Sequence, residues 1–253
     1  MVRRDPGRGR AALILTFTDF GREGPYLGEL EVALRRTAPE VPVVHLMADA
    51  PAFRPRPAAY LLAALAERLE PGDVLLGIVD PGVGGERRPV AALADGLWLV
   101  GPDNGLFEPL ARRARTLATY EIAWRPRRLS ASFHGRDLFA PVAARLARGD
   151  RSTLAPAPLT RHPDWPDDLP EVVHVDRYGN AMTGLRAATL PPDAVLTAAG
   201  RPLPRARTFS SVPPGEALWY ENSSGLAELA VNAGSAAAAL GLEVGSPVGV
   251  VPD

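Results

Sequence analysis

The stretch DVLLGIVDPGVGGERR, residues 73–88, carries the most information in this sequence. Its first half is a short apolar run typical of a buried strand, and Asp80 ends that run. A glycine-rich turn follows, where the backbone can approach a ligand closely because glycine has no Cβ. Arg87 and Arg88 follow the turn and can face Asp80. A carboxylate beside a guanidinium stays ionised and can orient water. The alternative interpretation is a tight turn closed by a surface ion pair.

Around this stretch, short apolar runs alternate with segments whose apolar residues have the spacing of an amphipathic helix. Continuous apolar runs at 12–18, 41–47 and 73–80 predict buried parallel strands. Leucines and alanines at three- and four-residue spacing predict helices at 26–37 and 57–69. Because strands and helices alternate, we expect an α/β fold with a Rossmann-like N-terminal domain.

The chain after residue 88 changes character twice. Residues 89–93 and 97–101 flank Asp95 and Gly96, which predicts a hairpin with a primed turn, and a further helix is expected at 138–148. Five prolines between 151 and 170 predict a linker, since proline disfavours both helix and central strand. Beyond it, short apolar runs predict a smaller β-rich, barrel-like domain, with strands at 172–175, 194–199, 217–221, 226–231 and 248–251 and a helix at 235–240. The predicted organisation is a disordered basic arm at 1–10, an α/β domain at 11–150, the linker at 151–170 and the β-rich domain at 171–253.

Composition excludes several classes of protein. The chain has 253 residues, a net charge of -1, no cysteine and four histidines. Disulfide frameworks, thiolate metal sites and cysteine nucleophiles are therefore excluded, and little material exists for a multi-histidine metal centre. The basic start and apolar residues 11–17 imitate a secretory signal, but Asp19 interrupts the run and no small-residue cleavage site follows. We expect a cytoplasmic protein without a membrane or nucleic-acid partner.

Polar clusters follow the predicted strands at the points where these strands end. They are Thr18 to Gly21, Asp80, Gly101 to Gly105, and Ser132 to Asp137 just before a helix. Ligands of open α/β sheets bind beyond the carboxyl ends of the strands, and helix N-termini favour polar or anionic groups. Each cluster alone also has a structural interpretation, as a helix cap for Asp19, an ordinary turn at 103–105, or a hydrogen-bonded His134. Four such clusters in one domain favour a ligand site.

Common catalytic and nucleotide motifs are missing. The sequence has no GxxxxGK[ST] and no GxGxxG after the first strand, which disfavours nucleoside triphosphates and nicotinamide cofactors. It also has neither GxSxG nor HExxH, which removes the common serine hydrolases and zinc proteases. The chemistry that remains is one acid, one or two arginines and one histidine.

Six collinear motifs resemble one family. They are TDFG (18–21), VDPGVGGERR (79–88), GPDNG (101–105), FHGRDLFAP (133–141), DRYGN (176–180) and NSSGLAELAVNAGSA (222–236). In this order and spacing the chain resembles the S-adenosyl-L-methionine hydroxide adenosyltransferases, relatives of the fluorinases and chlorinases. The resemblance runs through nearly the whole chain after the N-terminal arm.

The resemblance implies a fold, an assembly and a reaction. It implies an N-terminal α/β domain, a C-terminal β-barrel-like domain and a homotrimer, with the ligand between the N-terminal domain of one subunit and the C-terminal domain of its neighbour. The implied reaction is attack of water or hydroxide on C5′ of S-adenosylmethionine, giving adenosine and methionine without a metal or cofactor. The family's triad corresponds to Asp80, Arg87 and His134, with Arg88 as the second candidate for the arginine. Halogenating relatives carry tyrosine in place of this acid, so Asp80 favours hydrolysis.

Substrate contacts are also implied by the resemblance. Asp176, Tyr178 and Asn180 would reach the amino-acid end, Phe53 and Phe209 would flank the ribose or purine, and Ser223, Ser224 and Ala233 would line the adenine edge. The equally open interpretation of the two phenylalanines is core or interface packing. The full set of expected substrate-binding residues adds Asp19, Phe20, Asp103, Asn104 and Asn222.

Two departures from the family pattern concern ribose recognition. Gly24 stands in GREGPYLG where the family has an acid, with Glu23 beside it. After the second strand, His45 and Ala48 stand where an Asp-x-x-His run is usual. Two other hypotheses therefore stay open: a protein that binds S-adenosylmethionine or adenosine without turnover, and an enzyme of the same fold for another 5′-substituted nucleoside.

Overall fold

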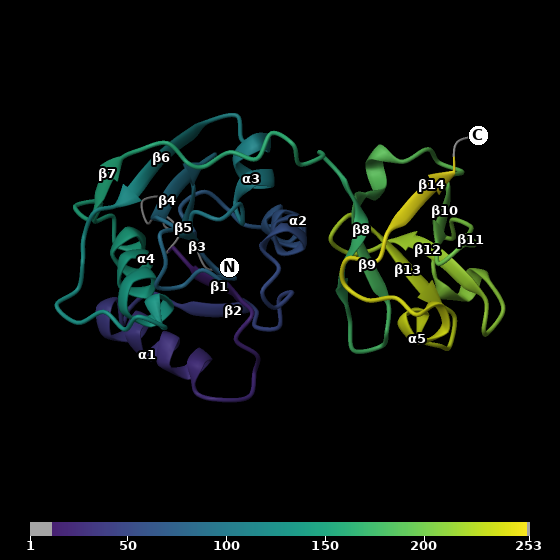
Figure 1. Cartoon of the computed structure of the whole chain (residues 1–253), viewed down its shortest axis with the longest axis horizontal. Helices are drawn as coiled ribbons and strands as arrows, with labels where there is room; N and C mark the ends of the chain where they lie inside the picture. Colours follow the sequence, from purple (N-terminus) through teal and green to yellow (C-terminus); the bar gives the residue numbers. More distant parts are fainter. Residues whose placement is uncertain (1–11, 252–253) are drawn as a thin grey trace, which may run out of the picture. The chain divides into compact units, whose positions relative to one another are not determined.

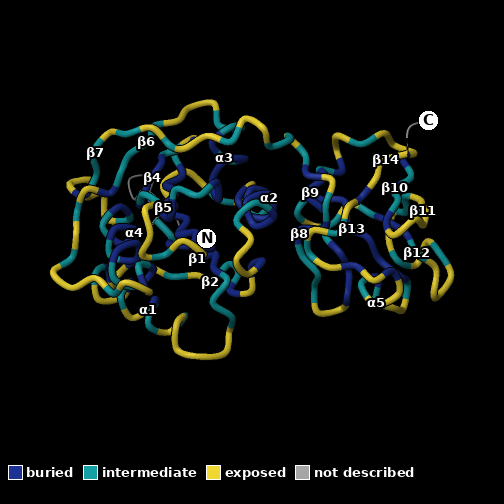
Figure 2. Tube along the Cα trace, in the orientation of Figure 1, coloured by how far each residue is buried: buried dark blue, intermediate teal, exposed yellow. Residues whose placement is uncertain are grey.

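The computed structural model describes residues 12–251 (Figure 1). The predicted disordered arm at 1–10 lies outside the described residues. Buried residues follow the strands and helices, whereas the exposed ones follow the connecting loops (Figure 2). None of the helices within residues 12–251 is both long and apolar enough to cross a membrane.

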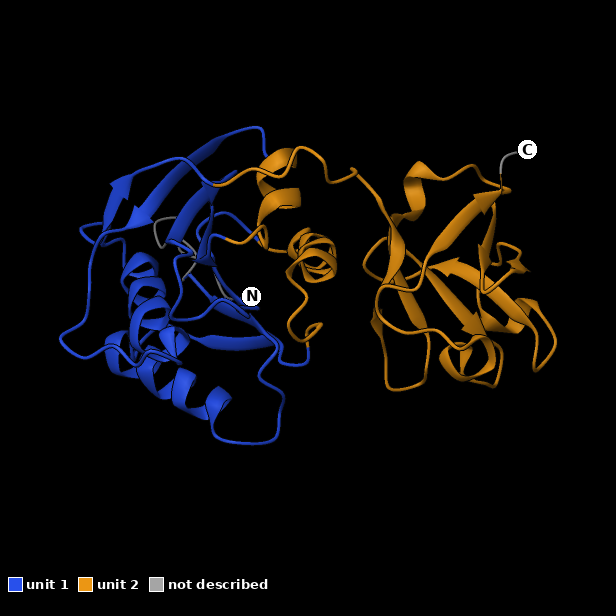
Figure 3. Ribbon diagram, in the orientation of Figure 1, with its two compact units in different colours: residues 1–49, 70–103, 114–159 blue, residues 50–69, 104–113, 160–253 orange. Residues whose placement is uncertain are grey.

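The chain divides into two compact units, each built from several segments (Figure 3). Unit 1 comprises the residues up to 49 together with 70–103 and 114–159, and unit 2 comprises 50–69, 104–113 and the residues from 160 onward. The α/β class and the β-rich second part agree with the prediction. These units are discontinuous in the sequence, because residues 50–69 and 104–113 cluster with unit 2. The contiguous domain boundaries given above stay predictions.

Unit 1 is built on a seven-stranded sheet in the order β2-β1-β3-β5-β4-β6-β7. Strands β1, β2, β3 and β5 run parallel, and β4 pairs antiparallel with both β5 and β6. The parallel strands β1 and β3 are buried along their whole length, as their uninterrupted apolar sequences predict. The strands span Ile14–Thr18 (β1), Val43–Met47 (β2), Val74–Ile78 (β3), Pro89–Ala94 (β4), Leu97–Pro102 (β5), Leu117–Ile122 (β6) and Leu154–Pro156 (β7).

Helices α1 (Tyr26–Thr37) and α4 (Ala140–Ala147) pack on one face of this sheet (Figure 1). Leu30 and Leu34 of α1 are buried in the same cluster as Val142 and Leu146 of α4. The apolar positions of α1 recur every three to four residues, so one stripe of the helix faces the sheet. The predicted helix at 26–37 and the hairpin of β4 and β5 are confirmed, with positive φ at Asp95 (47°) and Gly96 (88°) as a primed turn requires.

The helix predicted at 138–148 begins earlier than expected, with a π-helical turn. This turn, η1, spans Gly135–Phe139 and runs directly into α4. The Ala140 amide donates to the Gly135 carbonyl, five residues back instead of four. Pro141 explains the wide turn, because its ring has no N–H and would crowd the carbonyl four residues earlier. π-Helical turns of this kind are frequent at functional sites.

Unit 2 contains two small antiparallel sheets, in the orders β12-β13-β9-β8 and β11-β10-β14. The buried indole of Trp219 lies in their common core and donates to the Ala194 carbonyl at 2.8 Å. Strand β9 and the short β11 are additions to the predicted set. The strands are β8 (Leu169–Val175), β9 (Ala181–Arg186), β10 (Val195–Ala198), β11 (Arg201–Leu203), β12 (Ala217–Glu221), β13 (Leu226–Val231) and β14 (Val248–Val251), and the helices are α2 (Pro55–Ala66), α3 (Glu108–Arg113) and α5 (Ala236–Leu240).

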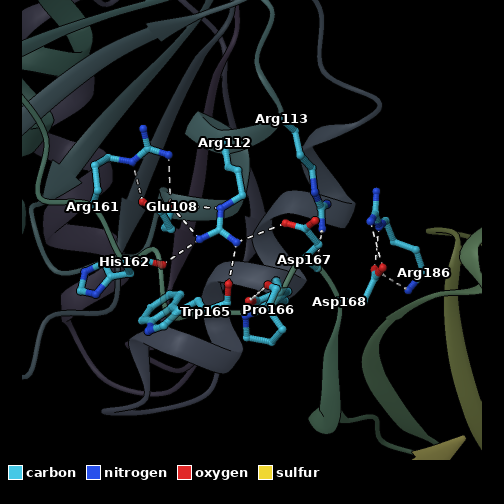
Figure 4. Close-up of polar contacts among 11 residues, drawn as sticks. Glu108, Arg112, Arg113, Arg161, His162, Trp165, Pro166, Asp167, Asp168 and Arg186 are labelled. Atoms are coloured by element: carbon cyan, nitrogen blue, oxygen red, sulfur yellow. Dashed lines mark hydrogen bonds and ion pairs between the residues drawn. The ribbon is translucent and has the colours of Figure 1, made fainter.

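The segment 151–170, expected to be a linker, is tied into regular structure. Residues 154–156 form β7, an edge strand in which Pro156 is tolerated because its missing N–H faces away from the ladder. Further along, the buried Glu108 of α3 accepts hydrogen bonds from Arg161 at 2.9 Å and Arg112 at 3.1 Å (Figure 4). Arg112 also donates to the carbonyls of His162 and Trp165. Proline content predicted the absence of helix here, but the network that fixes the segment needs α3, which the sequence did not reveal.

Candidate active site

The turn after β3 brings two separate stretches of unit 1 together. Gly84 has φ +78°, and a Cβ at this position would lie 2.4 Å from the Ala131 carbonyl oxygen. Only glycine fits at this distance and this backbone conformation. The glycine-rich turn therefore packs its backbone directly on the loop that leads to His134.

Asp80 and Arg87 form a nearly buried ion pair across this turn. Arg87 Nε lies 3.0 Å from both carboxylate oxygens of Asp80, and Arg87 Nη2 lies 2.5 Å from Oδ2. The Asp80 side chain is 5% exposed and that of Arg87 10%. The Arg87 guanidinium also lies 5.2 Å from the ring centre of Phe139. Burial and fork-like geometry distinguish this pair from the surface ion pair of the alternative interpretation.

His134 completes the cluster through the same guanidinium. Arg87 Nη2 donates to His134 Nδ1 at 2.9 Å, because a guanidinium has no acceptor. The imidazole therefore accepts at Nδ1 and carries its proton on Nε2. Burial and, next, the charge of Arg87 lower the pKa of His134 from its ordinary 6.5. The cluster thus consists of an anion, a cation and a neutral imidazole.

Arg88, the second candidate for the catalytic arginine, points to other partners. It donates to Asp103 at 2.6 Å and to the Pro158 carbonyl at 2.8 Å. Arg87 is therefore the arginine that the structure joins to Asp80 and His134. Asp103, expected to bind substrate, is 4% exposed and ion-paired with Arg88.

Three aromatic rings pack beside the backbone of His134. Phe20, which follows β1 and Asp19, meets Phe133 edge-on at 5.6 Å, and Tyr26 meets the same ring at 5.4 Å. A Cβ at Gly135 would lie 3.2 Å from Phe20 and 3.3 Å from Phe133. The small residue after His134 thus lets the π-helical turn sit against these rings.

Unit 2 carries a cavity of about 810 Å³ on its four-stranded sheet. Seven of the residues expected to bind substrate line it, although they come from three separate segments of the sequence, namely two of the six motifs and Phe209. These are Asp176, Tyr178, Asn180, Phe209, Asn222, Ser223 and Ala233. Met182, Tyr220, Glu228, Val231 and Gly234 complete the lining and were not predicted. Ser224 is next to this lining in the sequence and is not part of it.

Asp176 and Asn222 each organise a turn in the cavity wall. Asp176 accepts from the Tyr178 and Asn180 amides at 2.8 and 2.9 Å, and from Asn180 Nδ2 at 3.1 Å. Asn222 Oδ1 accepts from the amides of Ser224 and Leu226 at 2.9 and 3.0 Å. Both residues therefore shape the wall in addition to facing the cavity.

Glu228 is the functional candidate that the sequence analysis missed. Glu228 is only 3% exposed. Its carboxylate accepts hydrogen bonds from Asn222 Nδ2 at 2.8 Å and from the Tyr220 hydroxyl. Burial and the Glu228 carboxylate raise the pKa of Tyr220, so the phenol stays protonated and donates. The available signal was a single charge within the otherwise apolar strand LAELAV, residues 226–231.

The other expected contacts lie at separate places. Phe53 is 77% exposed with φ 60°, a conformation that is strained for a bulky residue. Asn104 Oδ1 accepts from the Leu106 amide at 3.2 Å, as in an Asx turn. The substrate-binding roles of these residues stay predictions.

The two departures from the family pattern have local structural roles. His45 Nδ1 lies 2.8 Å from Thr16 Oγ1, and its Nε2 lies 3.3 Å from Glu31. Ala48 is buried, and its carbonyl accepts from the Gly21 amide at 2.6 Å. Gly24 is exposed with φ +90° and has open space around it. Within residues 12–251, no group of three or more His, Asp or Glu side chains is arranged to hold a metal ion.

Two family models match the chain in tandem. The model of the SAM hydroxide adenosyltransferase N-terminal domain matches residues 14–155, and that of the C-terminal domain of the same family matches residues 170–249. The first match contains Asp80, Arg87 and His134, and the second contains the residues from Asp176 to Gly234 that line the cavity.

Curated proteins and solved structures are similar over nearly the full length. Proteins named (R)-S-adenosyl-L-methionine hydrolase are 43% identical in Thermus thermophilus (91% of this chain, 96% of that protein) and 38% identical in Salinispora arenicola (92% and 95%). The crystal structure of an uncharacterized conserved protein from Thermotoga maritima has a TM-score of 0.83 at 26% identity, covering 95% of this chain and all of that chain. The crystal structure of a conserved hypothetical protein from Thermus thermophilus has a TM-score of 0.75 at 38% identity, with the same coverage.

Proposed function

The chain belongs to the SAM hydroxide adenosyltransferase family, and we propose that it hydrolyses S-adenosyl-L-methionine to adenosine and L-methionine. The observation that carries this proposal is the hydrogen-bonded cluster of Asp80, Arg87 and His134. A buried anion, cation and neutral imidazole within one cluster suit the activation of a polar molecule such as water, and they have no comparable use in packing.

The proposed chemistry is a displacement at carbon. The water oxygen forms a bond to C5′ while the C5′–S bond breaks, and the electron pair of that bond returns to sulfur to leave methionine. Because a sulfonium leaves readily, the enzyme has little need of acid catalysis and must mainly orient the water. The reaction as written needs no metal and no cofactor, and we propose that the enzyme uses neither.

The hydrogen-bond pattern supports a proposed role for each member of the cluster. Arg87 occupies the Nδ1 lone pair of His134, so the imidazole offers only Nε2–H and holds the attacking oxygen as a donor. Asp80 is the remaining acceptor and takes the water proton, which then passes to solvent. Arg87 favours the developing hydroxide through its positive charge and fixes the other two groups.

We further propose that the protein is a homotrimer in which the substrate lies between the N-terminal domain of one subunit and the C-terminal domain of its neighbour. Family membership supports this assembly. The triad belongs to unit 1 and the cavity to unit 2, so each unit would supply one part of the proposed site. The cytoplasmic location stays a prediction from the sequence.

Product analysis with the purified protein tests the activity. Incubation with S-adenosylmethionine is expected to give adenosine and methionine in equal amounts, and Asp80→Asn is expected to abolish this while still binding the substrate. Substrate that binds to the wild type and stays intact would instead support a binding protein. Turnover of another 5′-substituted nucleoside with S-adenosylmethionine left untouched would indicate a different substrate.

A further inference from the structure

Glu228 differs in its partners from three other deeply buried carboxylates of this protein. A fourth, Asp73, accepts from the backbone amides of Leu13 and Glu70 and does not line this cavity. Three side chains that are at most 5% exposed each pair with arginine: Asp80 with Arg87, Asp103 with Arg88, and Glu108 with Arg112 and Arg161. Glu228 is equally buried, yet its donors are the neutral Tyr220 hydroxyl and Asn222 amide. A buried carboxylate that lacks a cation carries a desolvation cost that neutral donors offset only in part.

The cavity around Glu228 contains a second acid and no base. Asp176 also lines it, and the donors to Asp176 are two backbone amides and the side-chain amide of Asn180. Among the described residues that line this cavity, none is Arg, Lys or His. The wall thus combines two carboxylates with the aromatic rings of Phe209 and Tyr220, which lie 4.9 Å apart. Such a wall favours an occupant that brings its own positive charge.

We propose that Glu228 is a specificity-determining residue that accepts a hydrogen bond from the ammonium group at the amino-acid end of the substrate. This inference rests on the proposed function for the identity of the ligand. Each Glu228 oxygen uses one of its two acceptor positions on Tyr220 or Asn222, so a second position on each oxygen is left for the ligand. An ammonium supplies both charge and N–H donors, whereas a sulfonium has no donor and the adenine amine has no charge.

Calorimetric binding of two nucleosides tests this role without any turnover. S-adenosylhomocysteine keeps the ammonium but has a thioether in place of the reactive sulfonium, and adenosine lacks the amino-acid end. Glu228→Gln is expected to weaken the binding of S-adenosylhomocysteine at least about tenfold, because the variant loses a charge-assisted hydrogen bond. The affinity of this variant for adenosine is expected to stay within about twofold of the wild-type value. An unchanged affinity for adenosine also shows that the cavity is intact.

Glu221→Gln is the matched control, because it removes the same charge from the neighbouring strand at a side chain that is 51% exposed and faces Arg205. Its affinities for both nucleosides are expected to equal those of the wild type. Equal weakening of both ligands by Glu228→Gln, or weakening of neither, would overturn the proposal, since the first result indicates a structural role and the second no role.

A second arm changes the ligand and keeps the wild-type protein. The analogue of S-adenosylhomocysteine without the α-amino group is expected to bind at least about tenfold more weakly than the parent compound. Equal affinities would refute the assignment even if Glu228→Gln failed to fold. Both arms are independent of hydrolysis, so a protein that binds in this way and leaves S-adenosylmethionine intact would contradict the proposed function and keep this inference.

Discussion

Arg87 is the residue on which the proposed site depends, because one guanidinium binds both other members of the triad. Its Nε and Nη2 hold Asp80, and its Nη2 also donates to His134. A lysine would retain the charge but not the planar fork that reaches both groups. Sequence alone left Arg87 and Arg88 as alternatives, since neighbouring residues in a loop give no signal of which side chain turns inward.

Replacing each arginine by lysine separates their roles. Arg87→Lys is expected to lower kcat by about 100-fold or more, because it removes preorganised donors within a buried cluster. Arg88→Lys, which alters only the pairing with Asp103 and the Pro158 carbonyl, is expected to stay within about threefold. Steady-state rates of the two variants provide the comparison. Equal losses would show that Arg87 has no special role.

The lowered pKa of His134 predicts the pH dependence of activity. Only the neutral imidazole accepts from Arg87, and burial and Arg87 shift its pKa below 6.5. We therefore expect kcat/KM to stay constant as the pH falls through 6.5 and to decline only at lower pH. A decline centred at or above 6.5 would contradict the assigned environment.

The lowered pKa of His134 also makes the stability of the folded protein depend on pH. The unfolded chain takes up a proton at His134 near its ordinary 6.5, whereas the folded chain resists it. The contribution of His134 to stability is therefore complete above pH 6.5, decreases as the pH falls below that value, and levels off below the folded pKa. The difference in unfolding free energy between the wild type and His134→Asn, measured across this range, provides the test.

At the scale of elements, two backbone features position the triad: the tight turn at Gly84 and the π-helical turn at Gly135–Phe139. The glycines and Pro141 that cause these features are visible in the sequence. Their effect is not, because a close approach between Gly84 and Ala131 joins residues 47 positions apart. Strands and helices with strong periodicity, such as α1 and β3, were predictable because burial repeats along them.

Two glycine substitutions separate backbone strain from close packing. Gly84→Ala places a Cβ 2.4 Å from the Ala131 carbonyl at positive φ, so we expect more than about 2 kcal/mol of destabilisation and a large loss of activity. Gly24→Ala meets a similar φ but open space, and about 1 kcal/mol is expected. Denaturant unfolding with parallel activity assays measures both. Comparable effects at the two positions would mean that the contact with Ala131 is unimportant.

The same limit applies to the other elements that the sequence analysis missed. The short helix α3 has only six residues, and its buried Glu108 binds Arg112 and Arg161. Short helices lack a clear period, and a charged residue that is buried by partners far along the chain gives no local signal. The sequence therefore predicts a linker at 151–170, although Arg112 binds the carbonyls of His162 and Trp165 within this segment.

At the scale of the whole molecule, the six collinear motifs carried more of the functional prediction than periodicity did. Asp80, Arg87 and His134 come from two motifs and meet in unit 1, and the residues of three other segments share one cavity in unit 2. Asp103 and Asn104 belong to another motif: Asp103 accepts from Arg88, and Asn104 accepts from the Leu106 amide in a local turn.

Mixed oligomers test the proposed assembly. Asp80→Ala removes the triad acid and Asp176→Ala removes a cavity acid, and each variant alone is expected to be inactive. Co-expression of the two variants in equal amounts should restore about a quarter of wild-type activity. Each proposed site takes its triad from one subunit and its cavity from a neighbour, and each of these two parts is intact with a probability of one half. Light scattering should give three times the chain mass. Mixed samples with no activity would contradict a site shared between subunits.

In the proposed reaction, the triad directs a water molecule to C5′ of the substrate. Turnover of S-adenosylmethionine in heavy-oxygen water, followed by mass analysis of both products, tests it most directly. We predict one labelled oxygen in the 5′-hydroxyl of adenosine and none in methionine. Unlabelled adenosine, or label at any other position, would contradict the account.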